Sequence, residues 1–363
     1  MVGPLALPGS DFSPDRPSPF CRFEMQWLRL FRFVGWFADA FGLGLACWLL
    51  TMSPATALPE IWFAPPDNMP RFGIVPMADF PRLFDPEPAW LRALSHVHVF
   101  SLGSFYIQRA PEADLRRVLG FLEAHRIALD VGLQALPSED CGQGVEGITP
   151  SVKEPMAVAR RLRQMGANVR SFSFDEPLEY GHIYKGRAAC RYPAREVARR
   201  VGMTVQGVRE FYPGARFIDY EVAQDEPLPE WKETLSEWLS AFKAETGDSL
   251  DGLLIDVHFH DSWEEPIRAT IDILHANGVR AGLFLTAGGG STVTDESWME
   301  EAKGNVKSVF RAQLPLDFVD ITTWAKHPTR ILPETDPLSL TSLIHWYVEC
   351  RDRRIVDVCP PAN

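Results

Sequence analysis

Acidic residues follow three short runs of aromatic and aliphatic residues. Asp175 and Glu176 follow Ser-Phe-Ser-Phe, and Asp256 follows Leu-Leu-Ile. Glu221 stands near the end of Phe-Ile-Asp-Tyr-Glu-Val. A buried carboxyl group tends to keep its proton because burial disfavours the charged form, whereas a solvated one stays ionised. Two such groups in one site can act as a proton donor and as a base or nucleophile. These runs therefore indicate acid/base chemistry by carboxylates, provided that they end at one place.

The chain after residue 57 alternates eight β-rich apolar runs with segments of helical periodicity. The expected strands cover residues 61–64, 96–102, 127–133, 171–174, 216–222, 253–259, 281–285 and 318–322. Helices are expected over 112–125, 154–165, 194–211, 230–244, 266–276, 297–310 and 338–348. This order predicts an α/β fold, a single (β/α)8 TIM barrel, in which the carboxyl ends of all strands meet on one face. No glycine-rich phosphate-binding motif follows the first strand, which argues against a nucleotide-binding open sheet.

The run Phe-Asp-Glu-Pro at the end of the fourth expected strand resembles the Asn-Glu-Pro segment of the retaining (β/α)8 glycoside hydrolases. The resemblance covers the architecture of the predicted barrel and only a few residues in motif. It implies that Glu176 is the acid/base and that Asp175 holds the substrate. It also implies that a sugar stacks on Trp324, at the end of the eighth strand. We therefore expect hydrolysis of a glycosidic bond in a poly- or oligosaccharide, without a cofactor.

The seventh expected strand departs from that pattern. Those enzymes place a nucleophilic Glu there, whereas this chain has Thr-Ala-Gly-Gly-Gly and no carboxylate before Asp295 and Glu296. Glycosidic cleavage needs two carboxyl groups, one to donate a proton and one to attack or to activate water. We expect Asp256 or Glu221 to supply the second. A pairing of Asp175 with Asp256 is similar to the placement in α-galactosidase-like barrels.

Histidine and tryptophan residues complete the expected site. The additional substrate-binding candidates are His98, His258, His260 and Trp263. One alternative is a metal-dependent hydrolase, in which His96, these three histidines and Asp256 would activate water. The first strand lacks a His-x-His pair and the chain lacks His-Glu-x-x-His, so we expect no metal. The other alternative is a non-catalytic carbohydrate-binding barrel, which the missing seventh-strand carboxylate would explain.

Charge and composition limit the partners. The 363 residues carry a formal net charge of −12, and no run of Lys or Arg dominates the chain after residue 57. Nucleic acid is therefore not an expected partner, because phosphate binding needs a basic surface. The 11 Trp residues suit a neutral sugar, whose C–H faces stack on indole rings. The sequence does not indicate an oligomeric state.

The N-terminal segment is typical of an export signal. Arg29 and Arg32 precede an apolar run over 40–52, and Ala-Thr-Ala follows at 55–57. We predict cleavage after Ala57, a secreted or periplasmic protein, and no stable membrane span after processing. An uncleaved anchor is the alternative. The expected parts are the extension and signal at 1–57, the barrel at 58–349 and a tail at 350–363.

Four cysteines follow the predicted cleavage site, namely Cys141, Cys190, Cys350 and Cys359. An even number in an exported protein permits two disulfides, and three pairings are open. Cys141 with Cys190 would tie two loops together, and Cys350 with Cys359 would staple the tail.

Overall fold

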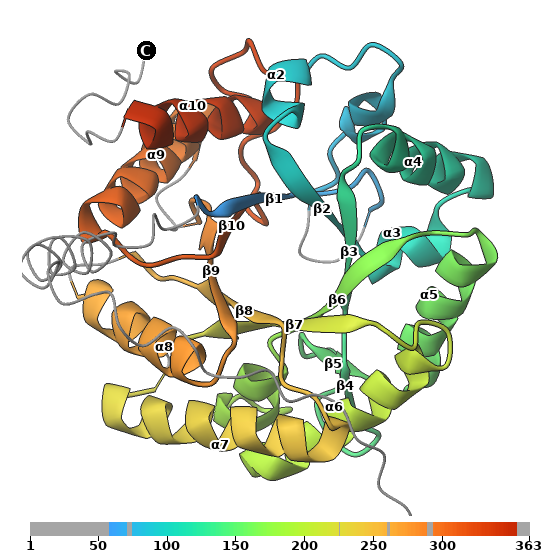
Figure 1. Cartoon of the computed structure of the whole chain (residues 1–363), viewed down its shortest axis with the longest axis vertical. Helices are drawn as coiled ribbons and strands as arrows, with labels where there is room; N and C mark the ends of the chain where they lie inside the picture. The colour runs from blue at the N-terminus through green and yellow to red at the C-terminus, as the bar shows by residue number, and fades with distance from the viewer. Residues whose placement is uncertain (1–57, 71–74, 225, 260–261, 289–292, 354–363) are drawn as a thin grey trace, which may run out of the picture. The chain divides into compact units, whose positions relative to one another are not determined.

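A closed barrel of eight parallel strands forms the centre of the computed structural model, which describes residues 58–70, 75–224, 226–259, 262–288 and 293–353. Around the barrel the strand order is β1-β10-β9-β8-β7-β6-β3-β2 (Figure 1). The strands are β1 (Glu60–Ala64), β2 (Val97–Gly103), β3 (Ala128–Leu133), β6 (Val169–Asp175), β7 (Arg216–Val222), β8 (Gly252–Asp256), β9 (Arg280–Leu285) and β10 (Phe318–Thr322). This confirms the predicted (β/α)8 barrel.

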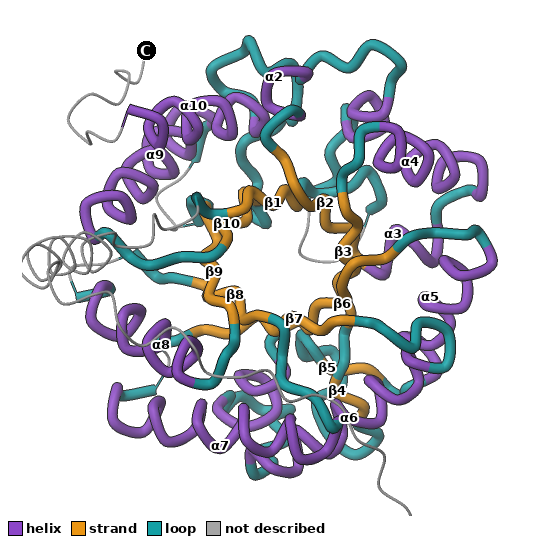
Figure 2. Tube along the Cα trace, viewed as in Figure 1, coloured by secondary structure: helices purple, strands orange, loops and turns teal. Residues whose placement is uncertain are grey.

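Helices surround the strands as an outer ring (Figure 2). They are α2 (Leu91–Leu94), α3 (Ser104–Arg109), α4 (Glu112–Ala124), α5 (Lys153–Gln164), α6 (Ala194–Arg209), α7 (Leu228–Thr246), α8 (Glu264–Ala276), α9 (Asp295–Ala312) and α10 (Leu340–Arg353). Local sequence fixes several ends. Helix α7 has proline in its first turn and is capped at its C-terminal end by Gly247, whose φ of 83° favours glycine. Thr294 and Ser297 form a capping box at the start of α9.

The sixth expected strand is shorter than the apolar pattern indicated. Strand β8 ends at Asp256, and the segment up to 259 is not part of the sheet. The side chain of Gln224 forms two hydrogen bonds with the backbone of His258. It accepts from the N–H of His258 at 2.8 Å and donates to the carbonyl at 3.0 Å. The backbone of His258 is therefore paired with a side chain and not with a neighbouring strand.

Side chains of alternate residues fill the barrel interior. The inner apolar cluster consists of Trp62, Val99, Ile218, Leu254, Phe284 and Phe318. Because strand side chains alternate at period two, the next inward positions toward the carboxyl end include Tyr220 and Asp256. Glu221 lies on the outward set. The outward residues pack beneath the helices in a larger apolar core.

An ion-pair cluster lies at the amino ends of the strands, and we call it the amino-end plug. Glu60 accepts hydrogen bonds from Arg170 at 2.9 Å and from Arg280 at 2.7 Å. The guanidinium of Arg170 lies over the Trp62 ring and that of Arg280 over the Phe318 ring. Burial alone would raise the pKa of Glu60, but the two arginines bring it below its ordinary value.

Among the described residues, no helix is both long enough and apolar enough to cross a membrane.

Candidate active site

Glu176 lies directly after β6, in a strained backbone conformation. Its φ of 49° is in the left-handed region, which residues with a side chain seldom adopt outside constrained sites. Its carbonyl accepts from the N–H of Tyr180 at 3.0 Å. Burial, reinforced by nearby carboxylates, raises the pKa of Glu176 to about 10. Glu176 is therefore protonated at neutral pH and can donate a proton.

After burial, the charges of nearby carboxylates contribute most to the raised pKa of Glu176. In decreasing order of effect these are Asp175, Asp256, Glu146 and Glu179. Asp175 ends β6, and Asp256 ends β8, so two strands of the barrel bring acids to one site. The structure thus places three of the predicted residues together at the carboxyl ends of the strands. Carboxyl groups that share one site but differ in pKa can act as a proton donor and as a base or nucleophile.

Glu221 is buried and its carboxylate is occupied by backbone amides. Its two oxygens accept from the N–H of Leu178 at 2.7 Å and of Glu179 at 2.9 Å. Burial, with a contribution from Asp219, raises its pKa well above the ordinary range. Glu221 therefore holds the segment that follows Glu176, which supports a positioning role rather than direct participation in catalysis.

We expect Glu221→Gln to destabilise the fold by about 1–3 kcal/mol, because the glutamine offers one acceptor to two buried amides. The denaturation midpoint should fall, and kcat should fall with it because Glu176 loses its anchor. Glu237→Gln, on the exposed face of α7, is the matched control and should leave both unchanged. An unaltered midpoint in Glu221→Gln would rule out the anchoring role.

A second acidic group, whose members were not among the residues predicted from the sequence, lies inside the barrel. Asp130 is fully buried and accepts from Ser171 at 2.6 Å, Ser173 at 2.7 Å and Tyr220 at 3.2 Å. Asp320 is also fully buried, and neither of its carboxyl oxygens has a hydrogen-bond partner among the described residues. Burial raises the pKa of both groups, and each lies on an inward strand position.

Aromatic rings connect the interior to the surface. Tyr220 packs edge to face on Phe284 with centroids 5.1 Å apart, and Phe284 packs similarly on Trp324 at 5.5 Å. Trp324 follows β10 and is 40% exposed, so its indole is available for stacking. Trp263 is 7% exposed and packs on Phe259, which makes it a core residue with little surface for a ligand.

The predicted histidines do not gather at one place. His98 is the second residue of β2, near the amino end of that strand, where its Nδ1 accepts from the N–H of Ile61 at 3.1 Å. A strand of this length separates it from the carboxyl ends by roughly 15 Å, so it cannot contact a ligand beside Glu176. His258 is exposed after β8, on the same side as Asp256. His260 lies outside the described residues.

The residues of the alternative metal site are also separated, because they lie at opposite ends of the barrel. His96 and His98 lie at the amino end of the barrel, whereas Asp256 and His258 lie at the carboxyl end. Within the described ranges, no group of three or more His, Cys, Asp or Glu residues is arranged to hold a metal ion.

Asp295 does not replace the carboxylate missing from the seventh strand. One of its oxygens accepts from His327 at 2.7 Å and from the N–H of Thr329 at 2.9 Å. The other accepts from the Thr329 hydroxyl and from Arg330. Asp295 therefore fixes the loop after β10 at the start of α9.

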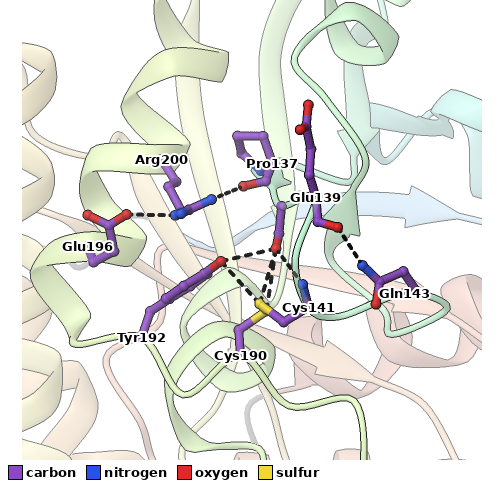
Figure 3. Close-up of a disulfide and its surroundings, with 9 residues drawn as sticks. Pro137, Glu139, Cys141, Gln143, Cys190, Tyr192, Glu196 and Arg200 are labelled. Atoms are coloured by element: carbon purple, nitrogen blue, oxygen red, sulfur yellow. Dashed lines mark hydrogen bonds and ion pairs between the residues drawn. A yellow bond between two sulfur atoms is a disulfide. The ribbon is translucent and has the colours of Figure 1, made fainter.

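A disulfide joins Cys141 to Cys190 with an S–S distance of 2.05 Å (Figure 3). It is one of the two disulfides suggested from the sequence. Ser138 and Tyr192 contact each other beside it at 3.0 Å. The bond ties the loop after β3 to the loop after β6, two loops that border the acidic residues. Cys359 lies outside the described residues, so its pairing with Cys350 stays a prediction.

No protein-family model matches the chain, and no curated protein matches it. Solved structures of xylanases are similar in fold. The intracellular xylanase TsXylA of Thermoanaerobacterium saccharolyticum has 11% identity and a TM-score of 0.44, with 74% of this chain and 90% of that chain covered. The endo-1,4-β-xylanase of Caldicellulosiruptor owensensis has 13% identity and a TM-score of 0.45, with 74% and 85% covered.

Proposed function

We propose that this barrel hydrolyses a glycosidic bond, with Glu176 as the proton donor. The observation that carries the proposal is the meeting of Glu176, Asp175 and Asp256 at the carboxyl ends of β6 and β8, where (β/α)8 enzymes place their active sites. Protonating a glycosidic oxygen needs an acid that is uncharged at the working pH. The raised pKa of Glu176 supports that role.

Asp256 is the second carboxylate in this proposal. It lies on a different strand from Glu176, so the two groups can approach a bound sugar from different directions. Its role is to attack the anomeric carbon or to activate water. Asp175 holds a substrate hydroxyl, and Trp324 stacks on a sugar face.

The test is release of reducing ends from a panel of soluble polysaccharides by the full chain. We expect release that survives EDTA treatment and disappears in Glu176→Gln. Release that EDTA abolishes would favour metal-dependent hydrolysis instead. A Glu176→Gln variant as active as the wild type would overturn the assignment of the proton donor.

A non-catalytic carbohydrate-binding barrel is the second candidate. The end of β9 favours it, because residues Thr286, Ala287 and Gly288 follow that strand without a carboxylate. Oligosaccharide binding measured by titration, with no reducing ends released from any substrate and no change in Glu176→Gln, would select this candidate.

Export is also part of the proposal. The Cys141–Cys190 bond supports it, since structural disulfides form mainly in oxidising compartments. N-terminal sequencing of the protein recovered from the periplasm or medium should begin at Leu58. Recovery from the cytoplasm alone, with an intact N-terminus, would contradict export.

Trp324→Ala should weaken substrate binding. If sugar stacking matches other ring contacts, at about 0.5–1.5 kcal/mol, KM should rise by about 2- to 13-fold. We expect a smaller change in kcat, because stacking on a sugar face contributes to binding and not to proton transfer. Trp324→Phe should restore part of the affinity. Equal KM values for the alanine variant and the wild type would exclude the stacking role.

A further inference from the structure

The loop between β3 and α5 extends along the carboxyl-end side of the barrel. It contains two short strands, β4 (Leu136–Pro137) and β5 (Ile148–Thr149), which pair with each other in parallel. The Cys141–Cys190 disulfide joins this loop to the segment after β6 (Figure 3). The N–H of Gly142 also donates to the carbonyl of Ala188 at 2.7 Å. We call residues 138–149 the stapled loop.

The stapled loop rests on the backbone of the candidate site. Gly147 has a φ of 70°, and a Cβ added there would collide with the carbonyl of Asp175. Only glycine permits this approach. The carbonyl of Gly147 accepts from the N–H of Leu136 at 3.1 Å, which fixes the contact from the other side. The residue before Gly147 is therefore placed within a short distance of Asp175 and Glu176.

That residue is Glu146, which is exposed. The hydroxyl of Tyr180 donates to the Glu146 carboxylate at 3.2 Å, while the backbone N–H of Tyr180 donates to the backbone carbonyl of Glu176. Tyr180 thus links the two glutamates. A carboxylate has about four acceptor sites, so the bond from Tyr180 leaves Glu146 able to accept from other donors.

Resting on the proposed function, we propose that Glu146 is a substrate-binding residue. It accepts hydrogen bonds from hydroxyl groups of the sugar unit next to the scissile bond, and the Cys141–Cys190 disulfide holds it there. Sugar hydroxyls are donors that a carboxylate group binds well. The contacts of Gly147 and Tyr180 supply the position, and the disulfide prevents the loop from moving away.

Steady-state kinetics of Glu146→Gln test the binding role. We expect KM to rise about tenfold, in the range for loss of a charge-assisted hydrogen bond, with kcat within about threefold of the wild type. Glu139→Gln is the matched control, because it changes the same charge at an exposed position of the same loop. An unchanged KM in Glu146→Gln would overturn the proposal. A large fall in kcat at constant KM would overturn it too, because Glu146 would then act in the chemical step.

The disulfide is tested with the double variant Cys141→Ser/Cys190→Ser. It should raise KM in the same direction as Glu146→Gln, and adding Glu146→Gln to it should produce less than the product of the two effects. Dithiothreitol should raise KM of the wild type, with thiol titration confirming reduction, and should not affect the double variant. A reduced wild type with normal KM would overturn the role of the disulfide.

A binding measurement separates this inference from the proposed function. Titration of an oligosaccharide into Glu176→Gln requires no turnover, and the Glu146→Gln/Glu176→Gln double variant should bind about tenfold more weakly. Equal affinity of the two proteins would overturn the inference while leaving hydrolysis standing. Weaker binding, with no substrate cleaved by the wild type, would support Glu146 as a binding residue and overturn the hydrolase proposal.

Discussion

Glu176→Gln is expected to lose about 10²–10⁴-fold in kcat on any substrate that the wild type cleaves, because glutamine cannot donate a proton to the leaving oxygen. Glutamine has almost the same shape and keeps the left-handed backbone as well as glutamate does, so the fold should persist. Circular dichroism and thermal denaturation check the fold, and initial rates of reducing-end release check the activity. A variant with wild-type rates and an intact fold would refute the donor role.

The same variant should be more stable than the wild type at neutral and alkaline pH. The pKa of Glu176 is raised from 4.5 to about 10 in the folded state. The folded state holds the Glu176 proton more tightly than the unfolded state does. This stabilises the folded protein fully below the unfolded pKa of 4.5, and the stabilisation is lost as the pH rises from there to about 10. Glutamine does not titrate, so the difference between the two proteins should widen from pH 5 upward. Parallel stability curves across this pH range would contradict the raised pKa.

Asp256→Asn should have an effect of similar size. The asparagine cannot act as nucleophile or base, so we expect kcat to fall by about 10²–10⁴-fold. Removing a negative charge near Glu176 should also lower the pKa of that acid, which was raised in part by Asp256.

The residual activity of Asp256→Asn should therefore be lost at a lower alkaline pH than the activity of the wild type. The matched control is Asp272→Asn, on the exposed face of α8, which should change neither the rate nor the pH profile. If Asp256→Asn retained full kcat, the second carboxylate would have to be another residue of the cluster.

Much of the fold could be predicted because the signals are local. Alternating runs of apolar residues located all eight strands, and strand ends placed Glu176 and Asp256 on one face. The sequence did not show that His98 lies near the amino end of β2, whereas Glu176 and Asp256 lie at the carboxyl ends of their strands. Trp263 was assigned to the site from its position in sequence, but its ring packs inward on Phe259.

The residues that sequence reasoning missed depend on contacts between distant segments. Glu146 reaches the site only because the stapled loop folds back over Asp175 and is fastened by a cysteine 49 residues along the chain. No periodic pattern reports such a contact. Asp130 and Asp320 could have been found, since each occupies an inward position in the middle of an otherwise apolar strand. A buried carboxyl group at such a position is a signal in itself.

For the proposed polysaccharide substrate, the amino-end plug limits the routes of approach and departure. Glu60, Arg170 and Arg280 fill the side of the barrel opposite the acids, above a packed interior of aromatic rings. A sugar chain therefore cannot thread through the ring of strands. It must lie across the face that carries Glu176, and both fragments must depart from that same face. Binding of the next substrate and release of the last product must therefore use the same face of the barrel. We expect product inhibition as a consequence.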